Sequence, residues 1–350
     1  MKIGIVTEYY YPYLGGIAEH VHYTYTNFTR LGHDVKIITP LMKDLKFGAD
    51  TRSDGWAPES SIIRAGDNHP FYFNDGFVRF TSPFGLGKRL KEVFAAERFD
   101  ILHVHAPLVP VLPMTAIAKA DCPVIGTCHT QVKRSLSYTL FHPWFKRIAD
   151  RLDGCIAVSP LAAETVEKHF NLSPTIIPNG IDTRLYNPLT PPASEFAGDR
   201  MKNIVFLGRF DPHNGLPVLL EAFREIHRSA PLTRLIVVGD GPLKTKYRKS
   251  IPRELACDVH FVGMQYLRKP AFYTTADVFV NPAFFHAQSI VCLEAMASGA
   301  PIVASDIPGF RWLMQEDAIY AMPGNSSALA AAVVNLLSDD ELRSSMKIRL

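Results

Sequence analysis

Residues 281–299 read NPAFFHAQSIVCLEAMASG, the most informative stretch of the chain. It predicts the end of a buried strand, an irregular loop, and a helix whose first turn offers free backbone N–H groups to an anion. Glu294 lies inside the apolar helical run and therefore needs a partner, because carboxylates are rarely buried alone. A ligand hydroxyl is one candidate, and a neighbouring cation or exposure to solvent is the alternative of equal weight.

Outward from this stretch, short apolar runs alternate with amphipathic segments along the chain. The alternation predicts parallel sheets covered by helices. The first series of expected strands covers residues 2–7, 35–38, 101–104, 123–126 and 155–158, with helices that include 19–31 and 160–170. The second series covers residues 203–207, 234–238, 259–262, 278–280 and 302–303, with helices that include 216–226 and 290–297.

The series restarts after a proline-rich stretch, NPLTPPAS at residues 187–194, which has the composition of a linker. We therefore expect two doubly wound α/β domains, at residues 1–183 and 201–350, joined by residues 184–200. Ligands of such sheets bind beside the carboxyl ends of the strands, so a deep cleft between the domains is the expected site.

Composition excludes several classes of protein. The chain has 350 residues, of which 47% are hydrophobic and 20% charged, which is typical of a globular protein with room for two cores. A net charge of +3, without an arginine-rich arm or zinc-finger spacing, argues against a nucleic-acid partner. The five scattered cysteines predict reduced thiols in a cytoplasmic protein, and no apolar run is long enough to cross a bilayer.

Glycines and hydrogen-bond donors follow the expected strands, where phosphate-bearing ligands bind. They are Gly15 and Gly16, His105, His129, Arg209, and Gly239 with Asp240 and Gly241. Glycine lets backbone N–H groups approach a phosphate, and a guanidinium bridges its oxygens. The pattern is not GxGxxG, which argues against a dehydrogenase site. An interdomain salt bridge for Arg209 and a satisfied histidine beside a strand for His129 remain alternatives.

These residues resemble the family 4 glycosyltransferases of the GT-B class, and most closely the phosphatidylinositol mannosyltransferase group. The matching segments follow the family's order from the first strand to about residue 310. They are Gly15-Gly16 with Glu19-His20-Val21, TCHT at 127–130, AVS at 157–159, IPNGID at 177–182, Gly208-Arg209, VGDG at 238–241 and LEAMASG at 293–299. The resemblance implies two Rossmann-like domains, an acceptor side first and a nucleotide-sugar side second. Because the chain stops at Leu350, we expect the family's C-terminal crossover helix to be short or missing.

The resemblance also implies an activity in glycolipid or polysaccharide biosynthesis. It is the retaining transfer of a hexose, with mannose as first choice, from a nucleotide diphosphate sugar to a lipid or glycan, without a metal ion or other cofactor. Arg209 would stabilise the departing nucleotide, His129 would contact the transferring sugar, and Glu294 would hold the ribose. Further donor contacts are implied for Gly15, Gly16, Asn214, Gly239, Asp240, Gly241, Ser289 and Ile290.

Two residues depart from the family pattern at the donor site. His286 stands where the first glutamate of a Glu-x7-Glu motif is expected, and we place it at the sugar as a hydrogen-bonding group. Asn214 stands where a lysine normally precedes the glycine. A lysine beside a phosphate contributes roughly 4 kcal/mol of Coulomb attraction before desolvation, so Asn214 predicts a weaker site unless His213 compensates. A catalytically impaired sugar-nucleotide-binding protein is therefore the main alternative, and a sugar-nucleotide epimerase is a third.

Residues 82–94 carry the pattern of a basic amphipathic helix, with Leu86 on its apolar face and Lys88, Arg89 and Lys91 around it. Such a helix can lie on an anionic bilayer. The resemblance implies attachment of this kind at the inner face of the membrane. An ordinary helix with a core-facing apolar side and solvated lysines is the weightier alternative.

Overall fold

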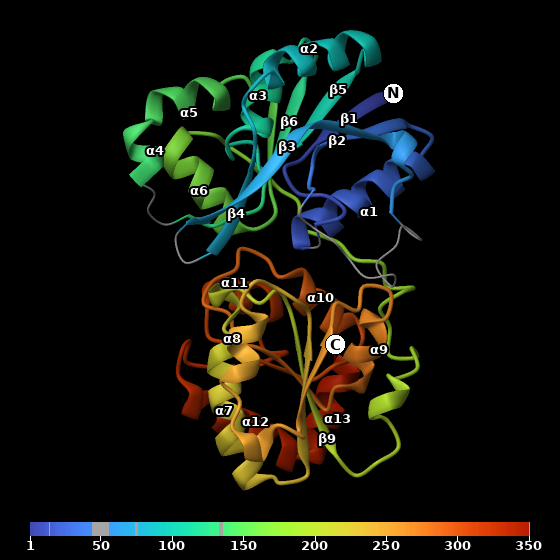
Figure 1. Cartoon of the computed structure of the whole chain (residues 1–350), viewed down its shortest axis with the longest axis vertical. Coiled ribbons are helices and arrows are strands. Elements are labelled where there is room, and N and C mark those ends of the chain that lie inside the picture. Colours follow the sequence, from blue (N-terminus) through green and yellow to red (C-terminus); the bar gives the residue numbers. More distant parts are fainter. Residues whose placement is uncertain (14, 44–55, 74–75, 133–135, 350) are drawn as a thin grey trace. The chain divides into compact units, whose positions relative to one another are not determined.

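The computed structural model describes residues 1–13, 15–43, 56–73, 76–132 and 136–349. The chain divides into two compact units between Gly180 and Ile181. Each unit has its own sheet, covered by helices (Figure 1). The predicted class, two Rossmann-like α/β domains, is confirmed, whereas the cleft between them stays a prediction.

The first unit is built on an eight-stranded sheet in the order β4-β3-β2-β1-β5-β6-β7-β8. The pairings from β2–β3 across to β7–β8 are parallel. The strands are β1 (Lys2–Val6), β2 (Asp34–Leu41), β3 (Ile62–Phe73), β4 (Gly76–Thr81), β5 (Ile101–His105), β6 (Val124–Cys128), β7 (Gly154–Ala157) and β8 (Thr175–Ile176). The helices are α1 (Gly16–Arg30), η2 (Glu59–Ser61), α2 (Leu86–Glu97), α3 (Leu112–Lys119), α4 (Leu136–Leu140), α5 (His142–Ala149) and α6 (Pro160–Phe170).

The second unit has a six-stranded sheet in the order β11-β10-β9-β12-β13-β14, with all of these pairings parallel. Its strands are β9 (Lys202–Leu207), β10 (Thr233–Val238), β11 (Val259–Gly263), β12 (Val278–Asn281), β13 (Ile302–Ser305) and β14 (Ile319–Ala321). Its helices are η3 (Ser194–Phe196), η4 (Pro212–Asn214), α7 (Leu216–Ser229), α8 (Lys244–Lys249), η5 (Arg253–Leu255), α9 (Lys269–Thr275), α10 (Ile290–Ala297), α11 (Pro308–Met314), α12 (Ser326–Ser338) and α13 (Asp340–Arg349).

Both faces of the second sheet are buried, which explains why its strands are continuous apolar runs. Along β9 the side chains alternate between two cores. Ile204 and Phe206 pack with α7 and α12, while Val205 packs with α9, α10 and α11. Burial on both faces removes the polar positions that would mark a half-exposed strand. The short apolar runs of the sequence therefore predicted five of these six strands, and β14 was missed.

Residues 184–200, which we expected to join the domains, lie within the second unit. Tyr186, Ala193 and Phe196 are buried in its core, next to α9. The amide of Ala193 donates a hydrogen bond to Thr275 Oγ1 at 2.8 Å. Proline-rich composition indicates an extended backbone, and here this extended segment packs against the rest of the second unit. The exact domain limits stay a prediction.

The structure corrects the expectation that Leu86 contacts a membrane. Leu86, Leu90 and Phe94 of α2 are buried in the core of the first unit, so the apolar face of this helix packs inward. Lys88, Arg89 and Lys91 remain exposed. The core-facing alternative is therefore the correct one for the apolar residues. Across the described residues, no helix combines the length and the apolarity that crossing a bilayer requires.

The sequence analysis did not predict β3 and β4, because β3 carries polar residues and a proline in place of an apolar run. Contacts with Glu8, just beyond β1, help to hold both strands. Glu8 Oε1 accepts hydrogen bonds from Asn68 Nδ2 at 2.6 Å and Thr81 Oγ1 at 2.7 Å. Burial raises the pKa of Glu8 to about 7, against the opposing effect of these hydrogen bonds.

Replacing Glu8 by Gln is predicted to change how stability depends on pH. The folded-state pKa is about 7 and the reference value 4.5, so the folded state binds more protons between these values and the wild type loses stability as pH rises. Relative to Glu8→Gln, the wild type should lose about 3 kcal/mol of unfolding free energy between about pH 4.5 and 8. Urea denaturation of both proteins measures this difference. A constant difference across that range would contradict it.

Candidate functional site

In the second unit, the predicted residues gather at the carboxyl ends of three adjacent strands, β10, β9 and β12. The loop after β9 contacts both of its neighbours. The amide of Phe210 donates to the carbonyl oxygen of Asp240 at 3.0 Å, and the amide of Phe284 donates to the carbonyl oxygen of His213 at 2.9 Å. The structure thus brings Arg209, residues 239–241 and the loop before α10 to one edge of this sheet.

Gly239 and Gly241 are required by this close approach. Gly239 has φ +136°, and a Cβ there would lie 2.0 Å from the carbonyl oxygen of Gly208. A Cβ on Gly241 would lie 2.9 Å from the backbone nitrogen of Phe210. Loop packing alone accounts for these two glycines, so a contact with phosphate remains a separate proposal.

Arg209 forms an ion pair with Asp211, whose side chain is almost completely buried. Burial raises the pKa of Asp211 to about 6. Asn214 Nδ2 donates to the carbonyl oxygen of Arg209 at 2.8 Å, which holds the loop closed. The residue at the expected lysine position therefore has a local structural role and carries no charge.

A second cation at this edge was missed by the sequence analysis. Lys244 at the start of α8 donates to Asp240 Oδ2 at 2.7 Å, and the amide of Gly241 donates to Asp240 Oδ1 at 2.8 Å. Asp240 thus orients the glycine loop and Lys244 together. Asp240 and Lys244 are four residues apart in the sequence, and this spacing of opposite charges could have predicted their ion pair.

The start of α10 has the features expected of an anion site. Ser289 is its N-cap and accepts a hydrogen bond from the amide of Cys292 at 3.4 Å. Asn281 Nδ2 lies 3.4 Å from Ser289 Oγ and supports this side chain. The amide of Ile290 belongs to the first turn, whose N–H groups have no acceptor within the helix. Ser289 and Ile290 are buried in the present structure.

Glu294 has the cation partner that the sequence left as an alternative. Its carboxylate is fully buried and accepts hydrogen bonds from Lys269 Nζ and Tyr273 Oη, each at 2.6 Å. Lys269 and Tyr273 stand one turn apart on α9. Both oxygens of Glu294 are therefore engaged within the protein, and its predicted contact with a ribose stays a prediction.

His286 lies in the loop before α10, beside two exposed phenylalanines, Phe284 and Phe285. Its ring stacks on Phe310 with centroids 5.6 Å apart, and burial lowers its pKa to about 4. The backbone of this loop packs closely on α11, since a Cβ on Gly309 would lie 1.9 Å from the carbonyl oxygen of His286. His286 is therefore a neutral hydrogen-bonding group and cannot replace a glutamate's charge at neutral pH.

In the first unit, Gly15 caps α1 and Gly16 is its first residue. Gly15 has an extended φ of 167°, and a Cβ there would make only ordinary contact, 3.4 Å from Tyr13 Cε1. Unlike Gly239, Gly15 is not required by the described surroundings. This freedom favours the prediction that its small size serves an approaching ligand.

His129, directly after β6, belongs to a cluster with His20 of α1 and His105 of β5. His105 Nδ1 lies 3.0 Å from His129 Nε2, and the rings of His20 and His129 have centroids 5.1 Å apart. Burial lowers the pKa of His20 to about 4 and those of His105 and His129 well below the usual 6.5. One nitrogen of each ring lies within 4.8 Å of the others, close enough for a shared metal ion, but a neutral His–His hydrogen bond explains the approach of His105 and His129.

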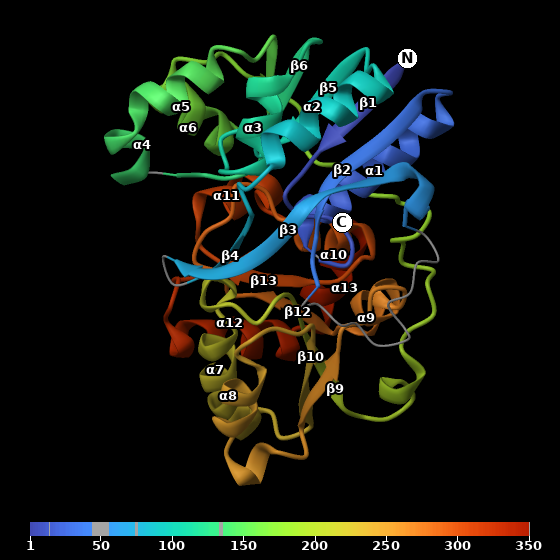
Figure 2. The same ribbon diagram turned by 45° about the horizontal axis from the view of Figure 1, so that its top comes forward.

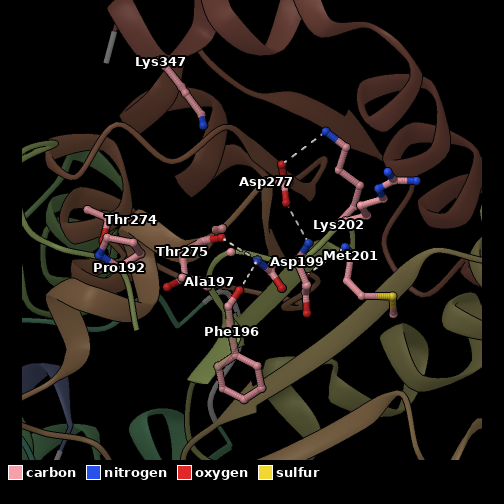
Figure 3. A pocket seen from close by; sticks show the side chains of 14 residues that line it. Pro192, Phe196, Ala197, Asp199, Met201, Lys202, Thr274, Thr275, Asp277 and Lys347 are labelled. Atoms are coloured by element: carbon pink, nitrogen blue, oxygen red, sulfur yellow. Dashed lines mark hydrogen bonds and ion pairs between the residues drawn. The ribbon is translucent and has the colours of Figure 1, made fainter. Parts of the chain in front are cut away.

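A pocket of about 510 Å³ opens elsewhere in the second unit (Figure 3). It lies at the amino ends of the strands, where Asp277 accepts from the amide of Asn203 at 2.8 Å and pairs with Lys202 at 3.6 Å. It is lined by Pro192, Phe196, Ala197, Gly198, Asp199, Arg200, Met201, Lys202, Asn203, Thr274, Thr275, Ala276, Asp277 and Lys347. None of the predicted donor residues lines it, so this pocket is separate from the candidate site.

Comparison with known proteins covers both units. A profile described as Glycosyltransferase Family 4 matches residues 14–185, and one described as Glycosyl transferases group 1 matches residues 201–339. A phosphatidyl-myo-inositol mannosyltransferase of Mycobacterium leprae is 31% identical over 98% of this chain and 89% of that protein. Its namesake from Mycolicibacterium smegmatis is 29% identical over 98% and 86%. The structure of Anabaena Alr3699/HepE in complex with UDP and glucose has the same fold, with a TM-score of 0.73 at 18% identity over 99% and 92% of the two chains.

Substitution of Lys269 by Met is predicted to destabilise the second unit, because it leaves the carboxylate of Glu294 buried with Tyr273 alone. Breaking a buried ion pair costs about 3 to 5 kcal/mol. The double variant Lys269→Met/Glu294→Gln should recover at least half of this loss, since no buried charge remains. Chemical denaturation measures all three proteins. Lys202→Met, which removes a more exposed partner of Asp277, is the matched control and should cost less than about 1 kcal/mol. Equal losses in the single and double variants would contradict the prediction.

Proposed function

The chain belongs to glycosyltransferase family 4, and from this membership we propose that it transfers mannose from a nucleotide diphosphate sugar to phosphatidylinositol, with retention of configuration. Use of a nucleotide-sugar donor follows from the family. The choice of mannose and of a lipid acceptor goes beyond what family membership implies. One observation carries this choice, namely 31% identity to a phosphatidyl-myo-inositol mannosyltransferase over nearly the whole of both chains.

The geometry of the second unit supports a diphosphate-binding role. Arg209 and Lys244, each paired with an aspartate, supply cationic hydrogen-bond donors beside the glycine loop at residues 239–241, and the first turn of α10 supplies backbone N–H groups. We propose that these groups stabilise the charge that develops on the departing nucleotide. The family's lysine attracts the diphosphate electrostatically, and Asn214 cannot do so. Lys244 would then supply part of this attraction.

The neutral histidines of the first unit support contact with sugar hydroxyls. In an uncharged imidazole one nitrogen donates and the other accepts. Because Nε2 of His129 contacts His105, its Nδ1 would bind a hydroxyl, as donor or acceptor according to the tautomer. His105 fixes the orientation of His129 through the 3.0 Å contact between their nitrogens. In the proposed reaction the acceptor hydroxyl attacks the front face of the sugar with help from the donor phosphate, and no protein nucleophile takes part.

A nucleotide-sugar-binding protein of low activity is the second candidate, because Asn214 and His286 remove a positive and a negative charge from the expected donor site. The proposed mannosyltransferase would act in the cytoplasm, at the membrane that contains its lipid acceptor. Measuring both binding and turnover of several nucleotide sugars separates the two candidates. The second candidate should bind a nucleotide sugar without transferring it.

We expect GDP-mannose, tested beside UDP-glucose and UDP-N-acetylglucosamine, to support transfer to phosphatidylinositol, with an α-linked product from the α-linked donor by NMR. Arg209→Ala should lower kcat by about a hundredfold or more, because it removes charge that stabilises the leaving group. Calorimetry with the same donors is the companion measurement. Tight binding with no transfer from any of them would favour the second candidate, and no binding at all would contradict both.

The substitution Asn214→Lys is predicted to raise kcat/KM by about tenfold, since even half of the raw lysine–phosphate attraction corresponds to more than that factor. His286→Glu tests the second departure in the same assay. Lys244→Met should lower kcat/KM in the wild-type background and lower it less in the Asn214→Lys background. No gain from Asn214→Lys would indicate a remodelled site that already functions fully.

A further inference from the structure

Three large apolar side chains are exposed together where α4 meets α5. Leu140, Phe141 and Trp144 have 64%, 57% and 52% of their surfaces exposed. Most other large exposed hydrophobic residues of the described chain stand singly or in adjacent pairs. Figures 1 and 2 both place α4 and α5 at the left edge of the first unit, beside α6. A cluster of this kind commonly marks an interaction surface.

The two sides of α5 have different surroundings. Phe145, Ile148 and Ala149 pack into the core of the first unit. Phe141, Trp144 and Arg147 follow one another at intervals of three residues, and all three are exposed. The core therefore anchors α5 through one side and leaves two aromatic rings and a guanidinium on the other.

The charge of this segment, including Asp150 directly after α5, is net positive. Residues 136–149 contain Lys146 and Arg147 and no aspartate or glutamate. Lys146 is paired with Asp150 one turn further on, whereas Arg147 is exposed beside the aromatic residues. Tryptophan and arginine together suit the boundary between an apolar layer and anionic headgroups, because each side chain combines an apolar body with a polar end.

We propose that Leu140, Phe141, Trp144 and Arg147 form a membrane-docking surface that inserts into the headgroup region of an anionic bilayer. This inference rests on the proposed function in one respect, since an enzyme acting on phosphatidylinositol must reach its acceptor at such a surface. The docking surface is distinct from the α2 helix, whose apolar residues Leu86 and Leu90 are buried. The α2 region exposes the single ring of Phe84 beside its basic residues, whereas this cluster offers three apolar side chains for insertion.

The experiment measures binding of the full chain to vesicles of phosphatidylcholine with and without phosphatidylglycerol. Phe141→Ser/Trp144→Ser should weaken binding to anionic vesicles by at least about tenfold, and Arg147→Glu should make binding less sensitive to salt. Leu232→Ser, which changes an exposed leucine of the second unit, is the matched control and should bind as the wild type does. Thermal unfolding of each variant checks that it is folded.

Fluorescence of the wild type provides a test without disruptive substitutions. Emission should shift to shorter wavelength on anionic vesicles and be quenched by brominated lipid, and Trp144→Phe should remove the shift. Unchanged vesicle binding in the Phe141→Ser/Trp144→Ser variant would overturn the proposal. So would sedimentation showing that this variant loses a dimer while vesicle binding persists, because a second copy would then be the occupant.

Transfer to short-chain, water-soluble phosphatidylinositol separates this inference from the proposed function. The docking variants should keep that activity and lose transfer to acceptor embedded in vesicles. If the wild type transfers sugar to neither form, the proposed acceptor is wrong, and the vesicle measurements still decide whether the surface docks. Equal loss on soluble and embedded acceptor would show a role in the site itself and would overturn the docking proposal.

Discussion

The architecture of the candidate site depends on one constraint, which is that parallel strands all send their following loops out at the same edge of a sheet. In the second unit β10, β9 and β12 are neighbours, so three loops far apart in the sequence meet there. Backbone hydrogen bonds from Phe210 to Asp240 and from Phe284 to His213 tie them together. The close approach leaves no room for a Cβ at Gly239. The same contacts therefore shape the loops and place Arg209.

Electrostatics differ between the two units. In the first, burial keeps His20, His105 and His129 uncharged, since each has a lowered pKa. In the second, Arg209 and Lys244 lie at the edge of the sheet, each paired with an aspartate. An uncharged hydrogen-bonding cluster suits sugar hydroxyls, and guanidinium and ammonium donors suit a diphosphate. This division of chemistry supports the proposal that the first unit takes the acceptor and the second the nucleotide.

A buried ion pair joins two helices of the second unit. The carboxylate of Glu294 is fully buried, and Lys269 and Tyr273 occupy both of its oxygens. Desolvation makes such a pair a weak source of net stability, but it makes the loss of either partner costly. The pair links α9 to α10, the helix whose first turn is the proposed anion site. A rigid α10 is the physical benefit we attribute to this arrangement.

The α/β class, most of the strands and the family were predictable from the residues alone, because apolar runs buried on both faces and glycine-rich turns leave local signals. The sequence placed Arg209 directly after a strand and Glu294 inside a helix, as the structure does. The partners of these side chains were visible only in the folded protein. Glu294 pairs with Lys269, and Leu86 packs into the core. An amphipathic pattern does not indicate which element packs against its apolar side. The tertiary structure also decided β3, whose polar side chains are stabilised by contacts such as that of Asn68 with Glu8. Pairing across long sequence separations is a property of packing, and no local pattern encodes it.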